Sequence, residues 1–240
     1  MKGWVLITRE AQDLPELRPW VPEELELVAF PVLRQVPWEE PAAWERLAQH
    51  LAELAVIACT SRHAPRPFLA QAQRRGLDAA LTQLPVAAVG EATAAACREV
   101  GLSVALVGSQ GGAALAETIS QRFTVPAGVV FPCGREHREE LVSRLHAAGF
   151  EVFPLPVYAM EPANPWQLPP LPPGPPRAVV LTSPRAANHY WQLTQGQFSA
   201  VPHLAWGATT AQELQKLGLA FEVLPQPNPK GLKEALCRIL

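Results

Sequence analysis

The sequence contains two half-patterns that each occur twice, in interleaved order, and this restricts the topologies that the chain can adopt. The repeats are 55–61 (AVIACTS) with 178–183 (AVVLTS), 89–94 with 206–211, and 26–32 with 151–157. The last pair belongs to one half-pattern, and the first two pairs belong to the other. Because the copies of the two half-patterns are interleaved along the chain, we predict two similar domains, one inserted into the other.

Short apolar runs alternate with amphipathic segments along the whole chain, which predicts an α/β architecture. The expected strands are Trp4–Thr8, Leu25–Phe30, Ala55–Cys59, Val86–Val89, Ser103–Val107, Gly128–Pro132, Glu151–Val157, Ala178–Thr182, His203–Trp206 and Ala220–Leu224. Most are apolar on successive residues, which is typical of strands buried on both faces of a parallel sheet. We expect two doubly wound parallel-sheet domains of about five strands each, joined by a two-stranded connector.

The expected helices include Pro41–Leu54 and Arg135–Ala148, in which apolar residues recur at helical spacing. Glycines that end helices in the left-handed conformation are expected at four positions, Gly76, Gly101, Gly149 and Gly218. These helices would connect the parallel strands through right-handed crossovers.

The domain boundaries follow from the repeats and from the prolines. We expect an outer domain of residues 1–33 and 159–240 and an inserted domain of residues 34–158. The crossing segments Phe30–Pro37 and Phe153–Glu161 are rich in proline, which favours extended backbone, so they are suited to a paired connector. Residues 162–176 contain eight prolines and are expected to form an exposed spacer.

Composition excludes several classes of protein. A net charge of −2 argues against a nucleic-acid partner. The cysteines and histidines lack the spacing of a disulfide framework or a local metal site, and no apolar stretch is long enough to span a membrane. The N-terminal segment does not resemble a secretory signal, so we expect a cytoplasmic protein. We also expect a monomer.

Hydroxyl residues and glycines recur where the expected strands end and helices begin. They are Thr60, Ser61, Gly90, Thr93, Ser183, Gly207 and Thr210. In a doubly wound sheet, ligands bind at this edge, and the backbone N–H groups of helix N-termini attract carboxylates and phosphates. Serine and threonine are also common helix N-caps, so capping is the alternative for each residue taken singly. Their recurrence in both repeats favours a cleft shared by the two domains.

Arg9 and Arg135, the latter after Gly134, also follow strand ends, where an arginine can bind a carboxylate or remain an ordinary surface charge. Tyr158 lies on the second crossing segment, where its hydroxyl can donate a proton or can pack at a hinge. His63 is expected to be a solvated residue at a helix start. The glycine-rich segment Gly108–Gly112 lacks the spacing of a dinucleotide site.

An ordered set of these motifs resembles the uroporphyrinogen-III synthase family across nearly the whole chain. The motifs are Ile7-Thr8-Arg9, Thr60-Ser61, Val89-Gly90 with Thr93-Ala94, Gly134-Arg135 heading a helix that ends at Gly149, Val157-Tyr158, Thr182-Ser183-Pro184, and Gly207 with Thr209-Thr210-Ala211. Each motif is short, and the specificity lies in their order and spacing. The proline-rich spacer is not part of the family pattern.

The resemblance implies two α/β domains and a reaction in which hydroxymethylbilane loses water, inverts ring D through a spiro intermediate and closes. It places the family's cleft tyrosine on Tyr158 and its cleft hydroxyls on Thr93, Ser183 and Thr210. It implies a small-molecule substrate and no cofactor. The alternatives are a non-catalytic relative that binds a tetrapyrrole or another anionic ligand as a sensor, and a generic hinge-type binding protein.

Overall fold

The chain divides into two compact units in the computed structural model, which describes residues 2–108 and 111–239. Unit 1 comprises Met1–Arg34 and Glu161–Leu240, and unit 2 comprises Gln35–Met160. The two divisions lie one and two residues beyond the positions expected from the sequence. Residues 109 and 110 of the glycine-rich segment lie outside the described residues.

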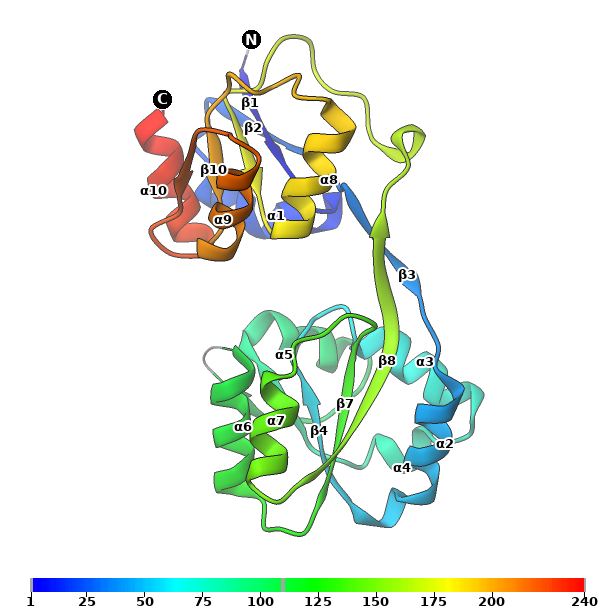
Figure 1. Ribbon diagram of the computed structural model, residues 1–240. Helices are drawn as coiled ribbons and strands as arrows, with labels where there is room; N and C mark the ends of the chain where they lie inside the picture. Colours follow the sequence, from blue (N-terminus) through cyan, green and yellow to red (C-terminus); the bar gives the residue numbers. More distant parts are fainter. Residues whose placement is uncertain (1, 109–110, 240) are drawn as a thin grey trace. The chain divides into compact units, whose positions relative to one another are not determined.

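Unit 1 contains a five-stranded parallel sheet with the order β11-β10-β9-β1-β2. Its strands are β1 (Gly3–Ile7), β2 (Leu25–Ala29), β9 (Ala178–Leu181), β10 (His203–Ala205) and β11 (Phe221–Val223). Its helices are α1 (Leu14–Leu17), α8 (Pro184–Thr194), α9 (Ala208–Lys216) and α10 (Pro229–Ile239), with 3-10 turns η1 (Ala11–Asp13), η2 (Arg18–Trp20) and η4 (Pro165–Gln167). Helices α8 and α9 cover one face, and α10 and the α1 region cover the other (Figure 1).

Unit 2 contains a six-stranded sheet with the order β3-β8-β7-β4-β5-β6. Its strands are β3 (Leu33–Pro37), β4 (Leu54–Cys59), β5 (Val86–Val89), β6 (Val104–Gly108), β7 (Gly128–Gly134) and β8 (Glu151–Pro162). Its helices are α2 (Pro41–Gln49), α3 (Pro65–Arg74), α4 (Asp78–Leu81), α5 (Gly90–Glu99), α6 (Gly111–Arg122) and α7 (Glu140–Ala147), with the turn η3 (Leu51–Glu53). Helices α6 and α7 cover one face, and α2 to α5 cover the other (Figure 1).

The two sheets have the same arrangement but start at different strands. Unit 1 has the order β2-β1-β9-β10-β11, and unit 2 has β8-β7-β4-β5-β6 with β3 added beyond β8. The β1 and β2 half of unit 1 therefore corresponds to β7 and β8 of unit 2, although β7 and β8 come last in that unit. This is the relationship expected from the interleaved repeats, and the predicted fold class is confirmed.

Burial along the strands follows their place in each sheet. All four residues of β9 and all seven of β7 are buried, whereas β6 and β11 at the edges alternate or remain exposed. Unbroken apolar runs are thus central strands, because helices cover both of their faces. Each of the ten strands expected from the sequence is present in the structure. The one further strand among the described residues, β3, was expected only as part of the connector.

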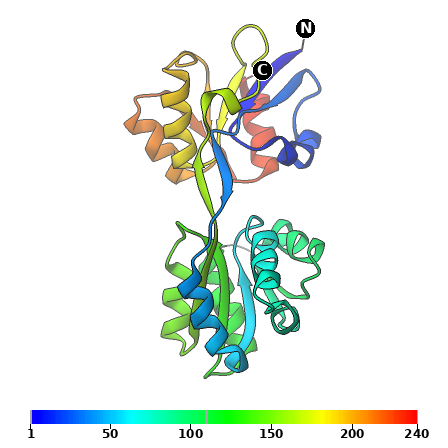
Figure 2. The same cartoon turned by 90° about the vertical axis from the view of Figure 1, so that its right-hand side faces the viewer.

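The crossing segments are strand neighbours. The Trp38 N–H donates to the Val157 carbonyl at 3.4 Å, and the Ala163 N–H donates to the Val32 carbonyl at 2.9 Å. These bonds place β3 beside the later half of β8, as Figure 2 shows. The earlier half of β8 pairs only with β7, so its other side is an edge of the sheet. Pro154 and Pro156 lie in this half, where a proline can stand without removing a hydrogen bond of the sheet.

Two helix predictions were too long. Helix α2 ends at Gln49 and is followed by η3, because β4 already begins at Leu54. Helix α7 begins at Glu140 and not at Arg135, because β7 continues to Gly134 and the Arg135 N–H still donates to the Tyr158 carbonyl at 2.7 Å. The predicted left-handed glycines are confirmed, with φ values from +67° to +89° at Gly76, Gly101, Gly149 and Gly218.

The proline-rich spacer is anchored to unit 1 by two leucines. It contains the single 3-10 turn Pro165–Gln167, in which the Asn164 N–H donates to the Gln167 side chain at 3.0 Å. Leu168 and Leu171 pack against the core, whereas Trp166 is 80% exposed. Among the described residues, no helix is long and apolar enough to cross a membrane.

Buried His203 predicts a stability that depends on pH. The side chain is 1% exposed, and its ring packs 5.8 Å from the Tyr190 ring. Burial lowers the pKa of His203 below its ordinary value of 6.5. His203 therefore binds a proton more readily in the unfolded chain than in the folded protein. As a result, the free energy of unfolding decreases as the pH falls from 6.5 towards the folded-state pKa. The loss reaches about 1.4 kcal/mol per unit of pKa difference.

Urea unfolding at pH 7.5 and 5.5 measures this loss. The His203→Gln variant should lose less stability between the two pH values than the wild type. His146→Gln, at an exposed position of α7, is the control and should behave like the wild type. An identical pH dependence in wild type and His203→Gln would show that His203 does not contribute.

Candidate active site

Unit 2 contains a cavity of about 350 Å³ at the carboxyl ends of β4 and β7. Its lining residues are Thr60, Ser61, Val89, Gly111, Gly112, Phe131, Cys133, Gly134, Glu136, His137, Arg138, Glu140, Leu141 and Tyr158. β4 and β7 are neighbours in the sheet. After β4 the chain adds β5 and β6 on one side of this pair, and after β7 it adds β8 on the other side. The cavity thus lies where the strand order reverses, the usual ligand position in a doubly wound sheet.

Tyr158 and Ser61 form a hydroxyl pair in this cavity. The Tyr158 hydroxyl donates to Ser61 Oγ at 3.1 Å, and the backbone N–H of His63 donates to the same oxygen at 3.2 Å. With two donors already on its oxygen, Ser61 has its own proton available to a ligand. These two residues, with Thr60 and Gly134, are the predicted site residues that the structure brings together.

Gly134 allows the Tyr158 ring to lie against β7. A Cβ atom at Gly134 would lie 3.1 Å from ring carbon Cζ, closer than ordinary packing permits. The pairing of β7 with β8 shifts register here, so Gly134 lies opposite Tyr158 after Cys133 has paired with Pro156. The ring therefore packs where the ladder is irregular and an ordinary side chain would not fit.

Burial holds the Tyr158 phenol in its neutral form. The side chain is 8% exposed. Desolvation by burial raises the pKa of Tyr158, and the Ser61 hydroxyl partly opposes this by favouring the phenolate. The cavity therefore presents a protonated hydroxyl, which can donate a hydrogen bond or a proton.

His63 lies just before α3, as expected from the sequence, but its half-buried side chain has protein partners. Its Nδ1 lies 2.9 Å from Gln35 Oε1, and the Gln35 amide donates to the His63 carbonyl at 2.9 Å. Its ring lies 6.0 Å from the Tyr158 ring. A glutamine on β3 thus holds the loop that carries Ser61, a contact that no local sequence pattern indicates.

The loop between β7 and α7 supplies lining residues that sequence reasoning missed. The sequence predicts a helix over residues 135–139, where the structure has a loop, so the pattern assigns no site role to Glu136, His137 and Arg138. His137 Nδ1 lies 3.1 Å from the Gly134 carbonyl oxygen, which folds the loop back over the strand end. The nearby start of α6, at Gly111 and Gly112, adds N–H groups suited to an anion.

Three predicted residues of unit 2 lie beside the cavity without lining it. Gly90 begins α5 with φ +71°, next to lining residue Val89, and Thr93 is 6% exposed in the same turn. The Arg135 guanidinium lies 4.6 Å from the Trp38 ring centre and 3.5 Å from Glu136. Arg135 therefore already has partners on the protein.

The equivalent strand ends of unit 1 are joined by a threonine pair. Thr8 follows β1 and Thr182 follows β9, and their hydroxyl oxygens lie 3.2 Å apart. The Thr182 N–H donates to Thr8 Oγ1 at 3.1 Å, and the Thr182 hydroxyl donates to the Thr8 carbonyl at 3.1 Å. These bonds link the two strands at the position that corresponds to the cavity of unit 2.

The predicted residues of unit 1 line the carboxyl edge of its sheet. Ser183 caps α8 by accepting the Ala186 N–H at 3.1 Å, and Gly207 caps α9 without a side chain. Thr210 is 2% exposed in the first turn of α9. The Arg9 guanidinium lies over the Trp206 ring at 4.4 Å and pairs with Glu16 at 2.8 Å.

One set of metal-ligating groups lies at the other edge of unit 2. His50, Glu53 and Glu151 have nitrogen and oxygen atoms within 4.8 Å of one another. Arg46 already pairs with Glu151 at 2.8 Å and neutralises its charge. Because these residues flank the amino ends of β4 and β8, they are not part of the cavity. All four cysteines are free thiols.

Comparisons with known proteins agree on one family. Residues 23–234 match the family described as uroporphyrinogen-III synthase HemD. The uroporphyrinogen-III synthetase from Helicobacter pylori has a similar structure, with 16% identity, a TM-score of 0.67 and coverage of 99% of this chain and 100% of that chain. A mutant uroporphyrinogen III synthase from Thermus thermophilus has 16% identity, a TM-score of 0.58 and coverage of 99% of this chain and 98% of that chain. No curated protein sequence matches the chain.

The hydroxyl pair predicts the response of Tyr158 to a change at Ser61. Ser61→Ala removes the hydroxyl that favours the phenolate, so we expect the pKa of Tyr158 to rise further. The sequence contains only two tyrosines, so an NMR titration of protein labelled at tyrosine ¹³Cζ resolves both signals. The Tyr190→Phe variant assigns them.

The control is Ser183→Ala, in which the pKa of Tyr158 should equal that of the wild type. If the pKa of Tyr158 is also unchanged in Ser61→Ala, the contact between Tyr158 and Ser61 is disproved.

Proposed function

The chain belongs to the uroporphyrinogen-III synthase family, and we propose that it closes hydroxymethylbilane with inversion of ring D and loss of water. The observation that carries this proposal is the family match over residues 23–234. The reaction balances without an oxidant or reductant, because the linear tetrapyrrole loses one molecule of water as the ring closes.

The donors at the strand ends suit a substrate that carries carboxylates on every pyrrole ring. In unit 2, the cavity is bordered by the start of α6 and by the Thr60 and Ser61 hydroxyls. In unit 1, the starts of α8 and α9 lie near Arg9. Helix N-termini and hydroxyls bind carboxylates without requiring a large net charge, which agrees with the chain's charge of −2.

We assign Tyr158 and Ser61 to the departure of the substrate hydroxyl. Ser61 can give its proton to the leaving oxygen while it receives the proton of Tyr158, with which it is already hydrogen-bonded. The C–O bond then breaks, water leaves, and an azafulvene cation forms. The cation stabilises the nearby phenolate, and the proton that the closing pyrrole carbon loses returns to Tyr158.

Positioning is the larger part of the proposed catalysis. The azafulvene cation cyclises readily without help, so the protein must determine which carbon of ring D attacks first. Holding the chain so that the substituted carbon reaches the cation leads to the spiro intermediate and the inverted ring. We further propose a monomeric, cytoplasmic enzyme with this small-molecule substrate. We also propose that it has no nucleic-acid partner, which the net charge of −2 supports.

The product isomer tests the proposed function. With hydroxymethylbilane as substrate, the wild-type chain should yield the type III isomer, whereas spontaneous closure yields type I. Separation of the isomers by chromatography after oxidation measures their ratio, with heat-denatured protein as the control. If only type I accumulates while the tetrapyrrole binds, the protein is a sensor of an anionic ligand and not a synthase.

Tyr158→Phe tests the proposed proton donor. This variant keeps the ring and removes the hydroxyl, so we expect turnover to fall about 10- to 100-fold while type III remains the main product. The loss is bounded because the leaving hydroxyl also departs spontaneously. The matched control is Tyr190→Phe in unit 1, which should retain wild-type turnover. If Tyr158→Phe turns over at the wild-type rate, Tyr158 takes no part in the chemistry.

A further inference from the structure

Gln71 on α3 is a buried amide that contacts both strands of the connector. Its Nε2 donates to the Trp38 carbonyl at 2.8 Å and to the Val157 carbonyl at 3.1 Å. The side chain is 3% exposed. Trp38 directly follows β3, and Val157 lies within β8. A single side chain therefore joins two strand segments that are far apart in the sequence.

The contacts of Gln71 fix the orientation of its amide. Both hydrogens of Nε2 point to carbonyls, and Oε1 accepts the indole N–H of Trp44 at 2.9 Å. A flipped amide would place a carbonyl oxygen against two others, so only one orientation satisfies all three partners. The low exposure leaves no water to replace a lost contact, which makes this buried group a rigid one.

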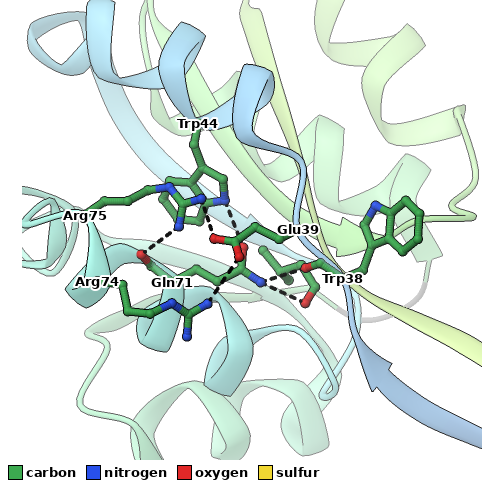
Figure 3. A network of polar contacts seen from close by, with 7 residues as sticks. Trp38, Glu39, Trp44, Gln71, Arg74 and Arg75 are labelled. Atoms are coloured by element: carbon green, nitrogen blue, oxygen red, sulfur yellow. Dashed lines mark hydrogen bonds and ion pairs between the residues drawn. The ribbon is translucent and has the colours of Figure 1, made fainter.

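Charged side chains lie next to the hydrogen bonds of Gln71, as Figure 3 shows. Glu39 pairs with Arg75 and lies 3.6 Å from Arg74, and the Arg75 hydrogen bond lowers the pKa of Glu39. Arg75 also lies 4.9 Å from the Trp44 ring centre. These contacts join the segment after β3 to the end of α3, and Arg75 also donates to the Gln71 main-chain carbonyl at 3.3 Å.

The peptide held by Gln71 leads directly to Tyr158. The Val157 carbonyl accepts from Gln71 and, at the longer distance of 3.4 Å, from the Trp38 N–H. The Tyr158 carbonyl accepts from the Arg135 N–H at 2.7 Å, beyond the register shift between β7 and β8. The β7–β8 ladder shifts register at this point, so the Gln71 bond adds a restraint on the backbone from which the phenol projects.

We propose that Gln71 is a positioning residue that holds the Val157–Tyr158 backbone so that the Tyr158 hydroxyl stays on Ser61 in the cavity. Only the expected effect of Gln71 on turnover rests on the proposed function. Its effect on the Tyr158–Ser61 contact is independent of any reaction. Gln71 touches neither the cavity nor the hydroxyl pair, and acts through the main chain.

Three variants of unit 2 separate this role from a contribution to stability. Gln71→Met keeps the length of the side chain and removes all three hydrogen bonds. Trp44→Phe removes only the bond to Oε1 and leaves both contacts to the connector. Phe68→Leu destabilises the same helix, because Phe68 is buried and stacks on Trp44 at 5.8 Å. If Gln71→Met does not fold, Gln71→Asn retains a polar amide that is one methylene too short.

The first measurement is the NMR titration of ¹³Cζ-labelled Tyr158 with and without Ser61→Ala. In the wild-type, Trp44→Phe and Phe68→Leu backgrounds, Ser61→Ala should raise the pKa of Tyr158. In the Gln71→Met background, Ser61→Ala should have no effect, because the hydroxyl has already left Ser61. If Ser61→Ala has its full effect in Gln71→Met, the proposal is overturned.

The second measurement is turnover of hydroxymethylbilane, compared at equal stability with Phe68→Leu. Gln71→Met should lower kcat about tenfold and leave KM within about twofold of the wild-type value. In the Tyr158→Phe background, adding Gln71→Met should not lower kcat below the value of Tyr158→Phe alone. An equal loss in Phe68→Leu, or losses that add in the double variant, would contradict a role through Tyr158. If Tyr158→Phe alone retains full turnover, the proposed function of Tyr158 fails, and the titration still decides the role of Gln71.

Discussion

The parallel order of the strands is the constraint on which the rest of this structure depends. All parallel strands of a sheet end at the same edge, and the helices that follow them begin there with unpaired N–H groups. In unit 2, the chain winds in opposite directions from β4 and β7, so no crossover covers the space between their ends. Ser61 and Gly134 meet in that space because β4 and β7 end beside it, and Tyr158 reaches it from within β8, which continues to Pro162.

The two repeats use the same position in different ways. In unit 1, Thr8 and Thr182 bind each other across the strand ends and leave their hydroxyls occupied. In unit 2, a glycine stands at the end of β7, and the space that it leaves is taken by a tyrosine from β8. Similar sheets thus provide a closed strand end in one unit and a cavity with an available hydroxyl in the other.

The environment of Tyr158 combines burial with hydrogen bonds from distant segments. Burial keeps the phenol protonated, and Ser61 offers a path along which its proton can move. Gln35 restrains the loop after β4, and Gln71 restrains the backbone of β8. The proposed proton donor is therefore held from both its side chain and its main chain, as catalysis by positioning requires.

The sequence by itself determined every strand except β3, the inserted topology and the glycine helix ends, because these depend on local periodicity and on repeats visible in one dimension. It also identified Tyr158, Ser61 and Gly134 as candidates, since each lies at a strand end or in the connector. Only the tertiary structure decided that residues 135–139 form a loop, that His63 packs on Tyr158, and that Gln71 joins Trp38 to Val157. The reason is physical: these contacts link residues far apart in the chain, and a buried amide acquires its partners only when the strands have assembled around it.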